Sequence, residues 1–162
     1  TNEPGTAPTY TSPLTAVKQG YRAFRTNRKN IIAAQRDFPD VPRLTAKQAE
    51  LLQVLDALLP DPRFCHAMQL EAGDMQLLNN YVVIHSRTDF QDFDEPDEKR
   101  HLLRLWLSVP QSQPLPDAWL PAFKDTRAGA VRGGVRGSNI TRAFLDYEAH
   151  QARHHGMPNS YC

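Results

Sequence analysis

The sequence has few of the features that mark secreted, membrane-bound or nucleic-acid-binding proteins. Its 162 residues include two cysteines, Cys65 and the terminal Cys162, too few for a disulfide framework. No apolar run approaches the roughly 18 residues that a membrane span needs. The formal net charge of +1 gives no global field for nucleic acid or a membrane surface. We therefore expect a cytoplasmic protein in a reducing setting that binds neither.

The chain does not begin with Met, and its first residues do not predict a signal peptide. Its first five residues, TNEPG, have no basic region and no apolar region. We expect the chain to be a piece of a longer protein. Residues 1–13 are polar, with three prolines, and predict a flexible tail.

The clearest predicted element is a helix over residues 45–59. Thr45 and Gln48 form a T-x-x-Q capping box, and leucines then recur at helical spacing until Pro60. Weaker patterns predict a short helix over residues 27–36 and a terminal helix within residues 140–155. Residues 108–139, rich in Pro and then in Gly and Arg, predict a loop.

Strands are predicted where the apolar pattern changes period. A short strand fits residues 21–25, and four more are expected over residues 64–70, 75–78, 81–85 and 100–107. Helices and strands do not alternate regularly, so an antiparallel sheet in a mainly β, α+β protein is favoured.

Two arginines on the last of these strands suggest a binding site for a carboxylate. Arg100 and Arg104 lie four residues apart, so in an extended chain they point to the same face. The planar guanidinium fork binds carboxylate oxygens in pairs. His85, at the end of the preceding strand, is suited to binding a metal.

Residues 73–87 (GDMQLLNNYVVIHSR) and 95–107 (EPDEKRHLLRLWL) together resemble the taurine dioxygenase / 2,4-D dioxygenase (TauD/TfdA) family. The resemblance implies a double-stranded β-helix, or jelly roll, and an iron(II) site formed by two His and one carboxylate. His85 matches the distal iron ligand, and Arg100 matches the residue that anchors 2-oxoglutarate. Arg104 matches a position that meets an anionic substrate in some members or supports the site, and Asn80 matches an Asn that shapes the turn.

One part of the family pattern is missing. The family's other two ligands form an H-x-D or H-x-E pair on an early strand. None of the six histidines is followed two residues later by an acid: His66, His85, His101, His150, His154 and His155. The chain therefore resembles the C-terminal half only. Residues 14–139 would form that half of the jelly roll, with a helical insert near 45–59, and residues 140–162 a terminal helix and tail.

The activity implied is hydroxylation of a small organic substrate, anionic where Arg104 contacts it, by O₂, with 2-oxoglutarate converted to succinate and CO₂. An N-terminal half carrying H-x-D/E, in the same gene product or a separate chain, would supply the remaining ligands. The sequence leaves open whether the protein forms a homo-oligomer. The alternatives are a non-catalytic jelly-roll fragment or partner subunit, and a cupin-type metal enzyme with another reaction.

Several of these residues and motifs also have alternative interpretations. Arg100 could pair with Asp97 or Glu98 at the surface. His150 and His154 have a spacing that can bind zinc, although a solvated helix face is favoured. The Arg-Gly stretch of residues 127–137 could suggest RNA binding, but it lacks interleaved aromatic residues.

Overall fold

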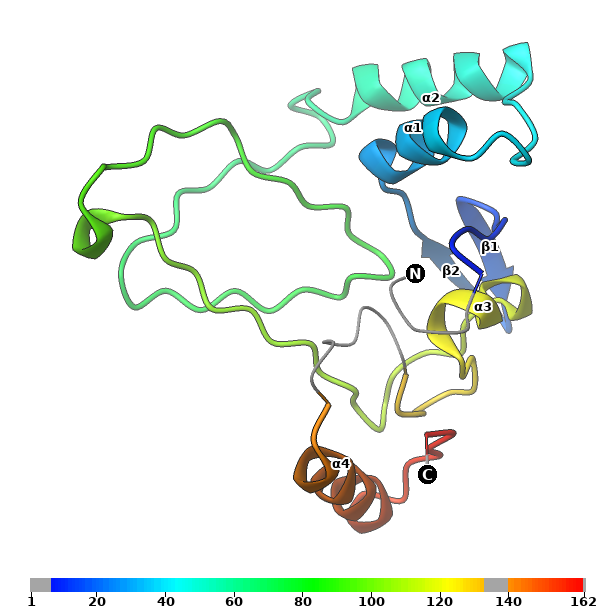
Figure 1. The fold of residues 1–162 in the computed structure, drawn as a ribbon, viewed down its shortest axis with the longest axis vertical. Helices are drawn as coiled ribbons and strands as arrows, with labels where there is room; N and C mark the ends of the chain where they lie inside the picture. The colour runs from blue at the N-terminus through cyan, green and yellow to red at the C-terminus, as the bar shows by residue number, and fades with distance from the viewer. Residues whose placement is uncertain (1–6, 133–139, 162) are drawn as a thin grey trace. The chain divides into compact units, whose positions relative to one another are not determined.

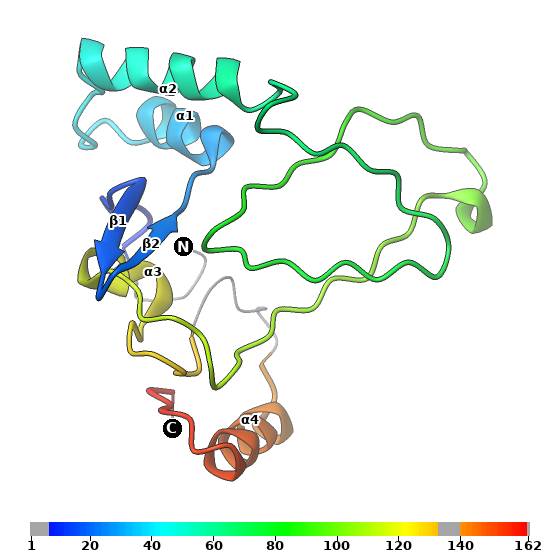
Figure 2. The same ribbon diagram turned by 180° about the vertical axis from the view of Figure 1, so that it is seen from behind.

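A computed structural model describes residues 7–132 and 140–161 (Figures 1 and 2). The described elements, in chain order, are β1 (Thr15–Lys18), β2 (Tyr21–Phe24), α1 (Arg28–Asp37), α2 (Ala46–Leu58), η1 (Pro96–Glu98), η2 (Asp117–Trp119), α3 (Leu120–Phe123) and α4 (Arg142–His154). The chain divides into two compact units. Residues 27–78 form the helical unit, and the described parts of residues 1–26 and 79–162 form the hairpin unit.

The helical unit holds two helices whose first turns are capped by side chains. Asn27 accepts a hydrogen bond from the backbone N–H of Asn30 at 3.1 Å, which starts α1. At the start of α2, the Thr45 hydroxyl accepts from the Gln48 N–H at 3.2 Å, and the Gln48 side chain accepts from the Thr45 N–H at 2.9 Å. This is the capping box predicted from the sequence.

Contacts between side chains hold the two helices together. In the connection between them, the Gln35 side-chain amide donates to the Pro42 carbonyl and accepts from the Leu44 N–H, both at 3.0 Å. Arg28 and Asp56 approach to 3.3 Å across the helices. Leu52 is the buried residue of α2, so this unit is stabilised by caps and a few contacts more than by a large core.

Substituting Thr45 with alanine removes the cap of α2 and leaves the Gln48 N–H without its partner. We expect a loss of about 1 kcal/mol in the free energy of unfolding of the helical unit. Urea unfolding followed by far-UV circular dichroism measures it. Thr45→Ser keeps the hydroxyl and should retain most of the stability; equal stability of all three proteins would contradict the capping role.

The hairpin unit begins with an antiparallel pair of strands. β1 and β2 pair in the register Thr15↔Phe24 to Lys18↔Tyr21. The two loop residues, Gln19 and Gly20, both have positive φ, at 49° and 82°. A two-residue hairpin turn of this kind needs positive φ at both positions, which Gly20 adopts without strain.

The core of the hairpin unit is centred on the fully buried side chain of Trp119. Leu115, Phe123 and Ala23 pack with it, and the half-buried Tyr81 joins the cluster. The Trp119 indole N–H donates to the Pro13 carbonyl at 2.9 Å, so its polar atom is satisfied inside the core. The core therefore joins three segments that lie far apart in the sequence.

The structure confirms the local predictions. Helices form where the sequence predicts them, as α1, α2 and α4, and β2 lies within the strand expected over residues 21–25. Together the helices and the small antiparallel sheet agree with an α+β class. The predicted loop over residues 108–139 is wrong at Asp117–Phe123, where η2 and α3 form and place Trp119 in the core.

The four strands predicted over residues 64–70, 75–78, 81–85 and 100–107 are wrong for the described structure, which has no strand there. A strand is stabilised by a ladder of hydrogen bonds to a neighbouring strand, and within the described residues none of these stretches belongs to such a ladder. Most of their apolar side chains stay exposed, to 85% at Met75 and 88% at Leu103. The jelly roll remains an implication of the family.

No helix among residues 7–132 and 140–161 combines the length and apolar character that crossing a membrane requires.

Candidate functional site

A hydrogen-bonded turn, here called the Tyr81 anchor (residues 79–83), attaches the His85 segment to the core of the hairpin unit. The Asn79 side chain accepts from the Tyr81 N–H at 3.1 Å, and the Asn79 carbonyl accepts from the N–H groups of Val82 and Val83 at 3.0 Å. The Tyr81 carbonyl in turn accepts from the Phe24 N–H at 2.8 Å. The bonds that define this turn thus come from Asn79, while its neighbour Asn80 is half-buried.

A buried arginine completes the anchor, and the sequence analysis did not single it out. The Arg132 guanidinium lies over the Tyr81 ring, 5.2 Å from its centroid, and Phe123 meets the same ring edge-on at 5.6 Å. Arg132 also donates to the carbonyls of Arg127, at 2.8 Å, and Gln113. No spacing in the sequence connects position 132 with position 81, so only the fold reveals this contact.

His85 lies two residues beyond the end of the anchor and is exposed to solvent. Its imidazole makes no hydrogen bond, ion pair or ring contact with any described residue. Either ring nitrogen is therefore available to a ligand, and a metal needs one of them.

Arg100 is also exposed, and its side chain packs against an aromatic ring instead of pairing with an acid. Its guanidinium lies 5.1 Å from the Phe90 ring centroid, and that of Arg87 lies 4.4 Å from the same ring. The Arg100 backbone N–H donates to Asp92 at 2.9 Å. No ion pair joins Arg100 to Asp97, Glu98 or any other described acid, so its guanidinium can still bind an anion.

The structure brings Arg87 and Arg100 together on Phe90, whereas no contact among the described residues joins His85 to Arg100. Arg104 is exposed, with no described partner. Within residues 7–132 and 140–161, no group of three or more His, Cys, Asp and Glu side chains could hold a metal ion. His85 and Arg100 are thus each exposed and without a described acidic partner, and no full set of metal ligands gathers around His85 among the described residues.

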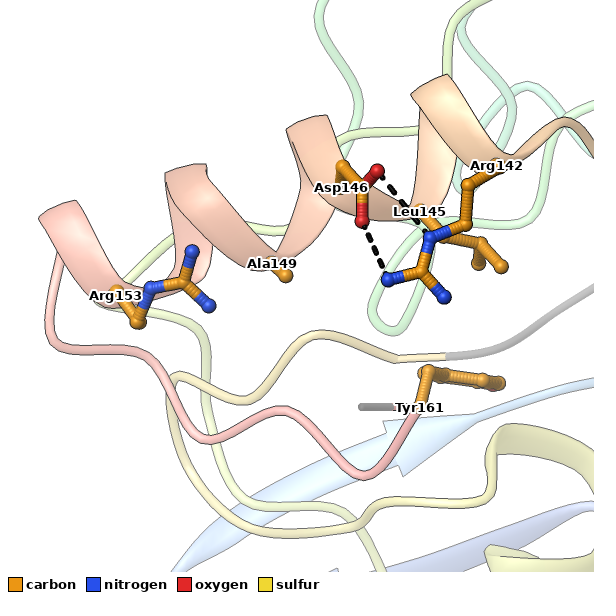
Figure 3. A pocket seen from close by; sticks show the side chains of 6 residues that line it. All are labelled: Arg142, Leu145, Asp146, Ala149, Arg153 and Tyr161. Atoms are coloured by element: carbon orange, nitrogen blue, oxygen red, sulfur yellow. Dashed lines mark hydrogen bonds and ion pairs between the residues drawn. The ribbon is translucent and has the colours of Figure 1, made fainter.

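Two other features of the hairpin unit hold no complete metal or anion site. On α4, the His150 and His154 rings stack at 6.4 Å, and His154 meets His155 at 4.8 Å. A shallow hollow lies between α4 and Tyr161 (Figure 3). Two arginines line it, Arg142 and Arg153, and Arg142 is already paired with Asp146 at 3.0 Å. None of the site residues expected from the sequence lines this hollow.

Asp125 is the buried carboxylate of the hairpin unit, exposed to 3%. It accepts from the Arg127 guanidinium at 2.5 Å and from the Ser160 hydroxyl at 2.7 Å. The hydrogen bond from Arg127 is the main reason that the pKa of this carboxyl lies well below its usual range, and the Ser160 bond adds to it. The charged form of Asp125 therefore ties residues 125–127 to the C-terminal segment.

Because the folded pKa of Asp125 is depressed, the stability it contributes is present above the unfolded pKa of about 3.9 and is lost as the pH falls further. We expect Asp125→Asn to lower the free energy of unfolding at pH 7 by roughly 1–3 kcal/mol. Below pH 4, the free energy of unfolding of this variant should fall less steeply with pH than that of the wild type. Urea unfolding at several pH values measures both effects.

Asp117→Asn is the matched control, since the Asp117–Lys18 ion pair lies at the surface, with the Asp117 side chain 78% exposed. Its effect should stay below about 1 kcal/mol. Equal effects of the two substitutions, or an unchanged acid decline in Asp125→Asn, would contradict the role given to the buried carboxylate.

Comparison with known proteins places the chain among dioxygenases. A profile of the family "Taurine catabolism dioxygenase TauD, TfdA family" matches residues 2–106. The match covers more than half of the chain and includes His85 and Arg100. The chain belongs to this family.

The chain is also similar to FR-33289 synthase of Streptomyces rubellomurinus. The two sequences are 31% identical over an alignment of 120 residues, and the alignment covers 70% of this chain and 34% of the synthase. The chain thus spans about a third of the length of this relative.

Proposed function

We propose that the chain forms part of the active site of an iron(II)- and 2-oxoglutarate-dependent dioxygenase, with His85 as an iron ligand and Arg100 as the 2-oxoglutarate anchor. The observation that carries the proposal is that both residues lie inside the family match, and neither side chain is paired with a described hydrogen-bonding or acidic partner. Unpaired His and Arg side chains can bind an external metal and an external carboxylate.

The iron would need two more protein ligands in addition to His85. This chain has no H-x-D or H-x-E sequence, and its described residues hold no three-ligand group. We propose that an N-terminal half, on the same or a separate polypeptide, supplies this pair. The N-terminal half together with this chain is here called the assembled protein.

When bound, iron supplies the activation of O₂ that couples conversion of 2-oxoglutarate into succinate and CO₂ to substrate hydroxylation. The residues of this chain would position the reactants. Arg100 would hold the distal carboxylate of 2-oxoglutarate, and its packing on Phe90 would restrict the guanidinium to fewer orientations. Arg104, which shares a face with Arg100 when the segment is extended, would meet a small anionic substrate or support the site.

Succinate formation from 2-oxoglutarate in the assembled protein, dependent on added Fe(II), is the direct test. Activity that needs the metal but forms no succinate would favour a cupin-type enzyme of another reaction. Arg87→Ala is a matched control, because Arg87 contacts the same ring as Arg100 but has no part in the proposed site. It should leave succinate formation unchanged.

A second candidate is a non-catalytic partner subunit, and the incomplete ligand set favours it. This candidate predicts that the chain takes up no iron even beside its N-terminal half. Measuring iron bound per assembled protein separates the two candidates before any substrate is known.

A further inference from the structure

Arg132 carries a buried positive charge in the hairpin unit, with 9% of the residue exposed. A charge taken out of water needs an acid or a full set of hydrogen bonds to offset the loss of hydration. No described acid pairs with Arg132, and the buried Asp125 is bound by Arg127 and Ser160. The Nε and Nη1 atoms of Arg132 have no hydrogen-bond partner among the described residues. Few groups are therefore left to offset its charge.

One aromatic ring and two carbonyls stabilise the Arg132 charge. Its Nη2 atom donates to the carbonyls of Arg127, at 2.8 Å, and Gln113, and its guanidinium lies 5.2 Å from the centroid of the Tyr81 ring. The attraction between a cation and a ring is stronger away from water than at an exposed surface. The Tyr81 ring is thus held by a buried cation in addition to its edge-on contact with Phe123.

The backbone around Arg132 is fixed by contacts that do not involve Tyr81. The Arg132 N–H donates to the Ser108 hydroxyl at 3.3 Å, and the Gly129 N–H donates to the Ser112 carbonyl at 2.9 Å. Gly129 has a φ of 64°, and a Cβ there would collide with the Pro110 carbonyl oxygen, so glycine permits this close approach. The guanidinium therefore rests on a packed frame and can determine where the Tyr81 ring lies.

The Tyr81 anchor in turn limits where His85 can go. Val83 is the last residue of this segment whose N–H is held by the anchor, and neither Ile84 nor His85 makes a described hydrogen bond. Two extended residues span at most about 7 Å. The imidazole of His85 therefore stays within a short reach of the anchor.

We infer that Arg132 is a positioning residue for the iron ligand His85, and that it acts through the ring of Tyr81. The inference rests on the proposed function for the role of His85. Arg132 lies beyond residue 106, where the family match ends, so the match assigns it no role. A displaced anchor would shift the imidazole relative to the other ligands, and groups that hold a metal ligand in place typically change metal affinity by about 10–100-fold.

Fe(II) affinity of the assembled protein, measured by equilibrium dialysis, tests the inference with Arg132→Met, which removes the charge and keeps most of the side-chain length. We expect affinity for Fe(II) to fall about tenfold or more. Binding of 2-oxoglutarate without iron should stay unchanged, because Arg100 makes no described contact with the anchor. A purely structural arginine would lower the free energy of unfolding and leave the iron affinity of the folded protein as it was.

Substitutions of Tyr81 show whether the ring carries the effect. Tyr81→Leu should weaken iron binding as Arg132→Met does, and Tyr81→Phe, which keeps the ring, should retain it. Combining Arg132→Met with Tyr81→Leu should cost no more iron affinity than either change alone, because both remove the same contact. Arg25→Met is the control, since the exposed Arg25 lies over the Phe123 ring at 5.6 Å. It should leave iron affinity unchanged.

Amide hydrogen exchange in the chain alone gives a measurement that needs neither iron nor the N-terminal half. The N–H groups of Val82 and Val83, which bond to Asn79, and of Phe24, which bonds to Tyr81, report the state of the anchor. We expect these amides to exchange at least about tenfold faster in Arg132→Met and in Tyr81→Leu than in the wild type.

Three results would overturn the inference: unchanged iron affinity in Arg132→Met and Tyr81→Leu, fully additive losses in the double variant, or an equal loss in Arg25→Met. Urea unfolding shows whether each variant keeps its core, and Tyr81→Leu carries the test if Arg132→Met does not fold. Failure of the wild type itself to bind iron would remove the proposed function. Wild-type iron binding that both substitutions leave unchanged would remove only the role of Arg132.

Discussion

Replacing His85 with alanine should abolish iron binding by the assembled protein, with at least about a 100-fold loss of iron affinity. Substitution of groups that only orient a metal ligand already costs about 10–100-fold, so loss of a ligand itself should cost more. His85 is exposed and makes no hydrogen bond, ion pair or ring contact with a described residue, so its removal should leave the fold unchanged. Iron bound per protein, measured after dialysis, gives the result.

His101 provides the matched control for this substitution. It lies in the same part of the chain, is exposed, and has no described partner. His101→Ala should retain iron. Equal iron content in the His85 and His101 variants would remove His85 from the metal site.

Replacing Arg100 with alanine should raise the concentration of 2-oxoglutarate needed for half-saturation by about 10–150-fold, which corresponds to roughly 1.5–3 kcal/mol. The reason is the loss of a charge-assisted, two-point contact to the distal carboxylate. Arg100→Lys keeps the positive charge without the planar fork, so its effect should be intermediate. The half-saturation concentration is read from succinate formation at increasing 2-oxoglutarate.

Two observations would contradict this role of Arg100. One is an unchanged requirement for 2-oxoglutarate in Arg100→Ala. The other is an equal rise in the 2-oxoglutarate requirement in Arg87→Ala. Arg87 and Arg100 both lie over the Phe90 ring, so an equal rise would mean that loss of positive charge in this loop, and not loss of a specific anchor, weakens binding.

Local signals in the sequence predicted local structure. The capping box of Thr45 and Gln48 involves neighbours three residues apart, so its geometry is set within one turn of helix, and α2 begins where expected. β2 also forms within the strand expected over residues 21–25, whereas its partner β1 and the two-residue turn at Gln19 and Gly20 were not predicted.

Elements that depend on distant partners could not be predicted in this way. The alternation in residues 100–107 shows a preference for strand, yet a strand needs a neighbour, and the described chain offers none. Trp119 lies in a stretch whose prolines indicate a loop, and its burial depends on Pro13 and Ala23 far along the chain. The contact of Arg132 with Tyr81 is equally non-local.

The residues of the candidate site were likewise predicted from local motifs, whereas their arrangement in space was not. His85 and Arg100 were found because they lie in two short motifs, and a motif requires no knowledge of the fold. The local turn that holds the first motif is formed by Asn79, next to the Asn80 that the resemblance singled out. How the two motifs approach each other depends on strand pairing, which the sequence of this chain alone does not determine.

The central claim is that His85 and Arg100 act on one bound molecule of 2-oxoglutarate. Equilibrium dialysis of labelled 2-oxoglutarate against the assembled protein, with and without Fe(II), tests it most directly. The claim predicts that Fe(II) tightens binding in the wild type, that His85→Ala loses this dependence on iron, and that Arg100→Ala binds weakly in both conditions. Wild-type binding in Arg100→Ala, or an intact effect of iron in His85→Ala, would contradict it.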